Sequence, residues 1–202
     1  MLYDNRFKGF NQHPSLEGTH AFLSPSKYHW LRYDQEKLIR TLETARAAAR
    51  GTSLHALAAH AITEGVKFYP DGSTISQYVN DAIDYRMQVE QTLFFTLDAF
   101  GQADAIGFDV YPEPDGNVIG FLRIHDLKTG VSPASMEQLY VYAAYFCLEY
   151  GFRPFQIDGE LRLYQNDAID YEPISRVTLT QVISVLLAHQ RTIEEWRVER
   201  DR

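Results

Sequence analysis

The sequence contains a single cysteine, Cys147, which excludes both an intramolecular disulfide and a cysteine-ligated zinc site. It has no apolar run near the roughly 20 residues that a membrane span requires, and residues 1–6 lack the apolar core of a signal peptide. No glycine-rich phosphate loop of the Gly-x-x-x-x-Gly-Lys type is present. We therefore expect a cytoplasmic protein without a membrane partner, in which Cys147, flanked by Phe146 and Leu148, is a buried and unreactive thiol.

Positive charge is also scarce, because 19 lysines and arginines face 27 aspartates and glutamates, for a formal net charge of −8. This balance argues against broad electrostatic attraction to nucleic acid, so that any such binding would depend on a local basic track. The length of 202 residues and the hydrophobic content of 45% predict one globular domain with a substantial core. We place this domain at residues 23–202 and an irregular arm at residues 1–22.

An apolar-rich segment, residues 120–130, contains an acid and a base two residues apart, Asp126 and Lys128. Side chains on a β-strand repeat every second residue, so these two project from one face while Leu127 points to the other. Asp126 and Lys128 therefore share one small volume. Taken alone, an Asp-x-Lys tripeptide is more often an exposed surface ion pair, which contributes little to stability.

Residues 101–110 predict a partner strand, because residues 111–117 between the two segments are dense in turn-forming residues. This pairing brings Asp104 beside Asp126. Carboxylates are the hard oxygen ligands that hold Mg²⁺ or Mn²⁺, and a nearby lysine can orient an attacking water. Such a set suits the hydrolysis of phosphodiesters without a covalent intermediate.

The other elements are predicted from hydrophobic periodicity and capping residues. Helices are expected from Ser24-Pro25-Ser26, over 35–50, from Thr52 or Ser53, over 73–87, over 133–150 and over 177–197, and strands over 91–97 and 155–165. The last strand can join the preceding meander through the helix at 133–150. We therefore predict an α/β (α+β) fold, with a mixed central β-sheet flanked by helices.

Several short motifs occur in order along residues 23–165. They are Leu23-Ser24-Pro25-Ser26, Gly51-Thr52-Ser53-Leu54-His55, Gly-x-x-Asp ending at Asp104, and Asp126-Leu127-Lys128 followed by a helix with Gln138 and Tyr142. In this order they resemble the PD-(D/E)xK nuclease superfamily, and the histidine motif resembles its RecB-type branch, which includes Cas4-like and phage λ-exonuclease-like enzymes. The resemblance implies a restriction-endonuclease-like core. Many Cas4-type proteins hold an iron–sulfur cluster with four cysteines, which this sequence lacks.

The resemblance implies a metal site for Mg²⁺ or Mn²⁺. Asp104 and Asp126 would bind the cation directly, and the main-chain carbonyl of Leu127 and the imidazole of His55 would complete its shell. A lone histidine beside an apolar stripe is usually structural, so the alternative for His55 is a core position.

The resemblance also implies catalytic roles for three residues besides Asp104 and Asp126. Lys128 would position the attacking water, and Gln138 and Tyr142 would hold the substrate or Lys128. On the sequence alone, Gln138 and Tyr142 would be an ordinary pair on a helix surface, because they lie four residues apart.

Basic and aromatic side chains alternate after Ser26, in a pattern that suits phosphate contacts combined with base stacking. We expect Lys27 and Arg32, together with Arg50, to bind DNA. The alternative is an amphipathic helix, because Trp30 and Tyr33 are three residues apart, as core-facing residues would be.

The predicted function is that of a metal-dependent DNA exonuclease in phage or bacterial recombination or repair, located in the cytoplasm of a bacterium or a phage-infected cell. Its partner would be DNA with free ends, and self-association or a recombination partner protein stays open. One alternative is a non-catalytic DNA-end-binding or adaptor protein. Others are a structure-specific endonuclease, since one fold supports several activities, and a hydrolase of another phosphate ester, which the lack of a phosphate loop disfavours.

Overall fold

The computed structural model describes residues 9–18, 21–45, 53–112, 118–128 and 134–200. At its centre is a five-stranded sheet in the order β1-β2-β3-β4-β5. The strands are β1 (Gln88–Thr96), β2 (Ala99–Pro112), β3 (Val118–Leu127), β4 (Ile157–Gln165) and β5 (Ala168–Pro173). Only the pairing of β3 with β4 is parallel, and the other neighbouring strands run antiparallel. The predicted α+β architecture with a mixed sheet is confirmed.

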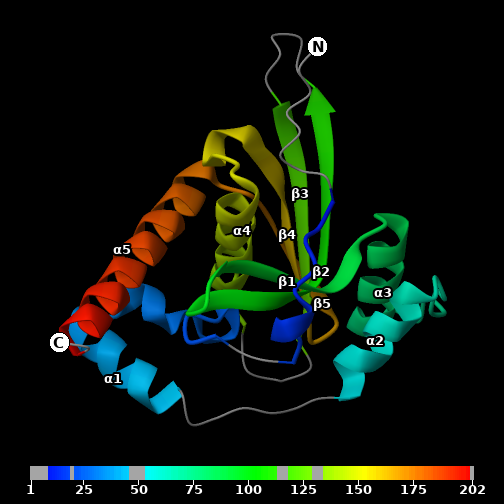
Figure 1. Ribbon diagram of the computed structural model, residues 1–202. Helices are drawn as coiled ribbons and strands as arrows, with labels where there is room; N and C mark the ends of the chain where they lie inside the picture. Colours follow the sequence, from blue (N-terminus) through cyan, green and yellow to red (C-terminus); the bar gives the residue numbers. More distant parts are fainter. Residues whose placement is uncertain (1–8, 19–20, 46–52, 113–117, 129–133, 201–202) are drawn as a thin grey trace.

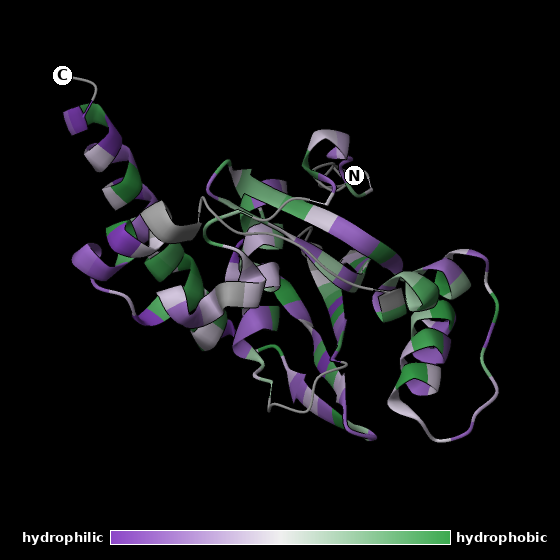
Figure 2. Ribbon diagram, turned by 90° about the horizontal axis from the view of Figure 1, so that it is seen from below, coloured by the Kyte–Doolittle hydropathy of each residue, from purple (hydrophilic) through white to green (hydrophobic). Residues whose placement is uncertain are grey.

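Helices cover both faces of this sheet (Figure 1). The α-helices are α1 (Gln35–Ala45), α2 (Ser53–Thr63), α3 (Thr74–Asp84), α4 (Glu137–Tyr150) and α5 (Arg176–Arg200), and the 3-10 helices are η1 (Pro14–Leu16), η2 (Pro25–Arg32) and η3 (Pro154–Gln156). Helices α4 and α5 lie on one side of the sheet, and α2 and α3 lie on the other. Figure 2 shows the same separation from below. Among the described helices, none is long and apolar enough to cross a membrane.

Helix α4 is the crossover that makes β3 and β4 parallel, and it is buried on nearly every side. Its Leu139, Ala143 and Phe146 have no exposed surface, and they pack with the sheet and α5 in the larger of two hydrophobic clusters. The helix ends at Gly151, whose φ of 71° lies in the left-handed region that glycine adopts without steric cost. Cys147 is buried on this helix, which confirms its predicted burial, and burial raises the pKa of its thiol to about 12.

The second hydrophobic cluster lies under α2 and α3, where Ala58, Val79 and Leu127 are among its buried members. Helix α3 begins at a serine cap, because Ser73 Oγ accepts a hydrogen bond from the Ser76 main-chain N–H at 3.3 Å. The sheet is therefore packed on both faces, and the ends of its central strands are held between helices from opposite sides.

Three elements differ from the sequence predictions. The helix expected from Ser24 is the 3-10 helix η2, and β4 starts at Ile157 because residues 154–156 form η3. Strand β5 was not predicted at all. It follows a two-residue turn in which Asn166 and Asp167 have φ values of 52° and 57°, a conformation that asparagine and aspartate tolerate better than most residues.

Candidate active site

The polar residues singled out in the sequence converge where β3 ends. Asp104 lies on β2, Asp126 is the next-to-last residue of β3, and His55 comes from α2. Gln138 and Tyr142 come from the first two turns of α4, on the opposite side of the sheet from α2. Strand pairing explains part of this arrangement. Ala105 lies opposite His125 in the β2–β3 ladder, and Asp104 and Asp126 are the residues next to that pair on their two strands. The prediction that the two aspartates lie side by side is confirmed.

Lys128, Asp126 and Gln138 form one contact group. Lys128 Nζ lies 2.7 Å from Asp126 Oδ2 and donates a hydrogen bond to Gln138 Oε1 at 2.8 Å. The Gln138 amide Nε2 in turn donates to Asp126 Oδ1 at 3.1 Å. Gln138 thus fixes the acid and the base relative to each other, and it is buried rather than placed on an ordinary helix surface.

Asp104 forms a second group with His55. Asp104 Oδ2 lies 3.3 Å from His55 Nδ1 and accepts a hydrogen bond from the Leu127 main-chain N–H at 3.0 Å. This hydrogen bond ties the Asp104 carboxylate to the end of β3. His55 is neither a core residue nor fully exposed, since 28% of its side chain is accessible.

The two groups influence one another electrostatically. Burial, and secondarily the charge of Asp104, raises the pKa of Asp126 from its usual 3.8 to about 7, against the opposing effect of Lys128. The hydrogen bond to Asp104 raises the pKa of His55 above its usual value, although burial acts in the other direction. Near neutral pH the site therefore retains more protons than the same groups would in water.

Tyr142 closes the site on the α4 side. Its hydroxyl lies 3.5 Å from Gln138 Nε2 and donates a hydrogen bond to the Gln102 main-chain carbonyl. Burial, followed by the charges of the two aspartates, raises the pKa of this phenol well above its usual value. Gly101 is required nearby, because a Cβ on it would lie 2.4 Å from Pro25 Cδ of η2. The glycine of the Gly-x-x-Asp motif thus allows η2 to pack against β2.

The donor atoms needed for a hard cation are present, although they are paired with other groups. Within the described ranges, no three histidine, cysteine, aspartate or glutamate side chains are grouped so as to hold a metal ion. His55 contacts Asp104, whereas Asp126 contacts Lys128. Asp126 Oδ2 is buried, and the Lys128 ammonium lies 2.7 Å from it. An oxygen of this kind is suited to a cation.

The predicted DNA-binding residues are not gathered at this site by the described contacts. Arg32 is exposed and forms an ion pair with Glu137, the first residue of α4. The side chain of Lys27 and the whole of Arg50 lie outside the described part of the structure. Trp30 is buried, and its indole N–H donates to the Ser24 carbonyl at 3.1 Å. Stacking of a DNA base on Trp30 is therefore excluded, and the amphipathic alternative for this segment is confirmed for that residue.

A buried polar cluster behind β3 was not assigned a role from the sequence. The Tyr164 hydroxyl donates to Asp81 Oδ2 at 2.6 Å and lies 3.2 Å from His125 Nδ1. Arg162 pairs with Asp81 at 2.9 Å, and Glu160 lies 3.5 Å from His125. The period-2 spacing of Glu160, Arg162 and Tyr164 indicated one shared face, but their partners on α3 and β3 could be found only from the fold.

A scan against protein-family models and a search of curated proteins both returned no match. Function is therefore inferred from the residues of the site themselves.

Proposed function

We propose that this protein is a metal-dependent deoxyribonuclease with a PD-(D/E)xK-type core. The observation that carries the proposal is the contact group at the end of β3. A buried carboxylate, Asp126, shares the ammonium of Lys128 with Gln138, and a second carboxylate, Asp104, is hydrogen bonded to the main chain between Asp126 and Lys128. A surface ion pair would not be buried in this way, since Asp126 is only 1% exposed.

The donor set fits Mg²⁺ or Mn²⁺. Asp104 and Asp126 would hold the cation, with the Leu127 carbonyl and His55 as further ligands, and the cation would share the buried Asp126 carboxylate with Lys128. When bound, such a cation supplies positive charge that stabilises the charge developing on the phosphate. His55 would tilt the preference toward Mn²⁺, because imidazole is a better ligand for Mn²⁺ than for the harder Mg²⁺.

The remaining steps fall to the side chains of the chain itself. Lys128 Nζ can donate a hydrogen bond to the attacking water or to a phosphate oxygen, and Gln138 keeps that ammonium from turning away. Water attacks the phosphorus and loses one proton to the solvent, the bond between the phosphorus and the leaving oxygen breaks, and that oxygen takes up one proton from the solvent. Tyr142 keeps its proton throughout because of its raised pKa, so it serves as a hydrogen-bonding wall rather than as a base.

A requirement for free DNA ends is the second part of the proposal. The chain carries a net charge of −8, so a long duplex should bind poorly away from a few local cations. DNA would then reach the metal only through a confined track, which favours progressive degradation from an end.

The test uses end-labelled linear DNA and a covalently closed circle, each incubated with Mg²⁺, Mn²⁺ or EDTA. We expect degradation of the linear form only, no activity in EDTA, and cleavage reduced by about a hundredfold or more in a Lys128→Met variant purified in parallel. Rapid nicking of the circle would identify an endonuclease instead. DNA-end binding without any cleavage would identify a non-catalytic adaptor.

A further inference from the structure

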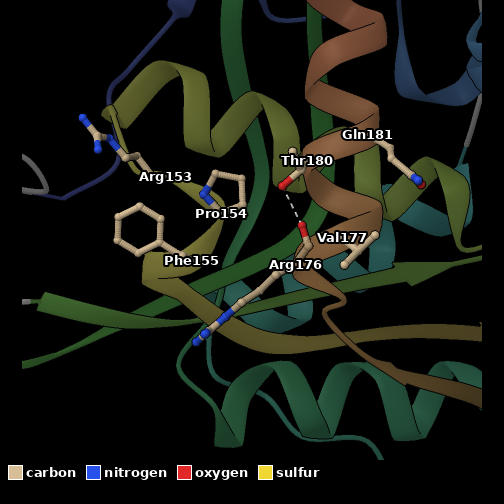
Figure 3. Close-up of a pocket in the computed structure, with 7 residues that line it drawn as sticks. All are labelled: Arg153, Pro154, Phe155, Arg176, Val177, Thr180 and Gln181. Atoms are coloured by element: carbon tan, nitrogen blue, oxygen red, sulfur yellow. Dashed lines mark hydrogen bonds between the residues drawn. The ribbon is translucent and has the colours of Figure 1, made fainter.

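A shallow groove lies at the opposite end of α4 from Gln138, between η3 and the first turns of α5 (Figure 3). It has a volume of about 570 Å³. Helix α4 has 14 residues and so is about 21 Å long. A molecule bound in the groove would therefore leave the catalytic end of the sheet uncovered.

The surface of this groove is apolar. Phe155 is 58% exposed and Val177 is 69% exposed, and Pro154 lies between Phe155 and Arg153 (Figure 3). The Thr180 hydroxyl donates a hydrogen bond to the Arg176 main-chain carbonyl of the same helix at 2.7 Å, so this donor is not available to a bound molecule. Adjacent exposed apolar side chains of this kind are typical of interaction sites.

Two guanidinium groups border this apolar surface. The Arg153 guanidinium lies 6.0 Å from the centre of the Phe155 ring and the Arg176 guanidinium is held by Asp158 Oδ1 at 2.6 Å. Arg176 also begins α5, whose N-terminal end carries the positive pole of the helix dipole. The groove thus combines apolar contact area with positive potential.

We propose that this groove binds a partner protein through a short acidic peptide segment that carries one large apolar side chain. The apolar residue would pack against Phe155 and Val177, and a neighbouring carboxylate would pair with Arg153, since the Arg176 guanidinium is held by Asp158. Arginine is well suited to this task, because its planar group holds a carboxylate with two parallel hydrogen bonds.

DNA fits the same groove less well. Tight binding of a nucleic acid needs several phosphate contacts, whereas the groove offers two guanidiniums, one of which is already paired with Asp158. The apolar contact area also matches a side chain better than a sugar–phosphate backbone. No residue of the groove belongs to the proposed catalytic site, so peptide binding is independent of the proposed nuclease activity.

The experiment uses fluorescein-labelled heptapeptides, each with six Asp or Glu residues around one Phe, Leu or Ala, and a matched series with Lys in place of the acids. Fluorescence anisotropy with the full-length protein should show binding of the acidic Phe and Leu peptides, and much weaker binding of the acidic Ala peptide and of the Lys series. Arg153→Glu and Val177→Glu should each weaken this binding by about tenfold or more.

Two variants provide matched controls. Val198→Glu makes the same exchange near the other end of α5, where Val198 is 55% exposed, and Arg191→Glu reverses an exposed arginine of that helix. Both should bind the acidic peptides as the wild type does, and all four variants should keep the wild-type melting temperature and DNA cleavage.

Three results would overturn the assignment. The first is equal binding of the acidic and Lys series, or no binding of either. The second is a loss of DNA binding in Arg153→Glu and Val177→Glu, which would make the groove a nucleic-acid site. The third is concentration-dependent self-association that these two variants abolish, which would make its occupant a second copy of the chain.

Discussion

Replacing Asp126 with asparagine should abolish cleavage and also change how stability depends on pH. The exchange keeps the shape of the side chain. It also keeps an oxygen that can accept the hydrogen bond from Gln138, which is 3.1 Å long in the wild type. Lys128 keeps its hydrogen bond to Gln138 and is 26% exposed, so its ammonium can be solvated. What the variant loses is a buried carboxyl group that must ionise above neutral pH.

The size of this effect follows from the pKa of Asp126, which burial and Asp104 raise from 3.8 to about 7. One pKa unit corresponds to about 1.4 kcal/mol, so ionising this group costs up to about 4 kcal/mol more in the folded protein than in the unfolded chain. Between the two pKa values the folded protein holds a proton that the unfolded chain has released. The free energy of unfolding of the wild type therefore falls as the pH rises through this window.

The measurement is urea unfolding of the wild type and Asp126→Asn at pH 5 and pH 8 with EDTA present. The stability of the variant relative to the wild type should rise by about 2–3 kcal/mol between these pH values. Asp167→Asn makes the same exchange on the exposed turn before β5 and controls for the exchange itself. Parallel pH profiles for the wild type and Asp126→Asn would refute the claim that Asp126 ionises at a cost.

Three further predictions concern single side chains. Lys128→Met should reduce cleavage by about a hundredfold or more, while its Mn²⁺ affinity, measured by calorimetry, stays close to that of the wild type. Loss of Mn²⁺ binding would instead show that Lys128 is needed to form the metal site. His55→Ala should narrow the preference for Mn²⁺ over Mg²⁺, measured as the ratio of cleavage rates at saturating metal, whereas an unchanged ratio with lower stability would make His55 structural. Arg32→Gln should weaken DNA binding and lower the slope of log affinity against log salt by about 0.9, and Arg40→Gln, on the neighbouring exposed helix α1, should leave that slope unchanged.

The meeting of the two aspartates could be predicted because it depends on local rules. Turn formers between residues 101–110 and 120–130 indicated a hairpin, and the period of two along each strand placed Asp104 and Asp126 next to each other. The helix at 133–150 was long enough for a crossover, so a parallel strand after it was also predictable.

Strand β5 could not be predicted by the same rules. Its residues are exposed apart from Glu172, which is half-buried, and apolar and polar residues alternate only over the four positions 169–172. The Asn166-Asp167 turn was a second short signal, and both residues adopt positive φ values there. Strand β5 forms by main-chain pairing with the edge of β4. Sequence patterns indicate which side chains are buried more clearly than which strands pair.

The burial of Gln138 and Tyr142 was also beyond local rules. Spacing on α4 indicated a shared face, but it could not show that α5 and η2 pack against α4 and leave it little exposed surface. A glutamine that would be unremarkable on a surface helix becomes, under that cover, the link between Asp126 and Lys128. Tertiary packing therefore decided its environment.

The polar cluster behind β3 connects helix α3 to the strand that carries the candidate site. The Lys128 main-chain N–H donates to the Tyr164 carbonyl at 2.9 Å, and the Tyr164 side chain is held by Asp81 of α3. His125, one residue before Asp126, has no exposed surface and contacts the Tyr164 hydroxyl. Through these contacts α3 fixes the backbone that carries Asp126 and Lys128, while α4 fixes their side chains through Gln138. The acid and the base are thus oriented from both faces of the sheet, which is the condition a preorganised catalytic pair requires.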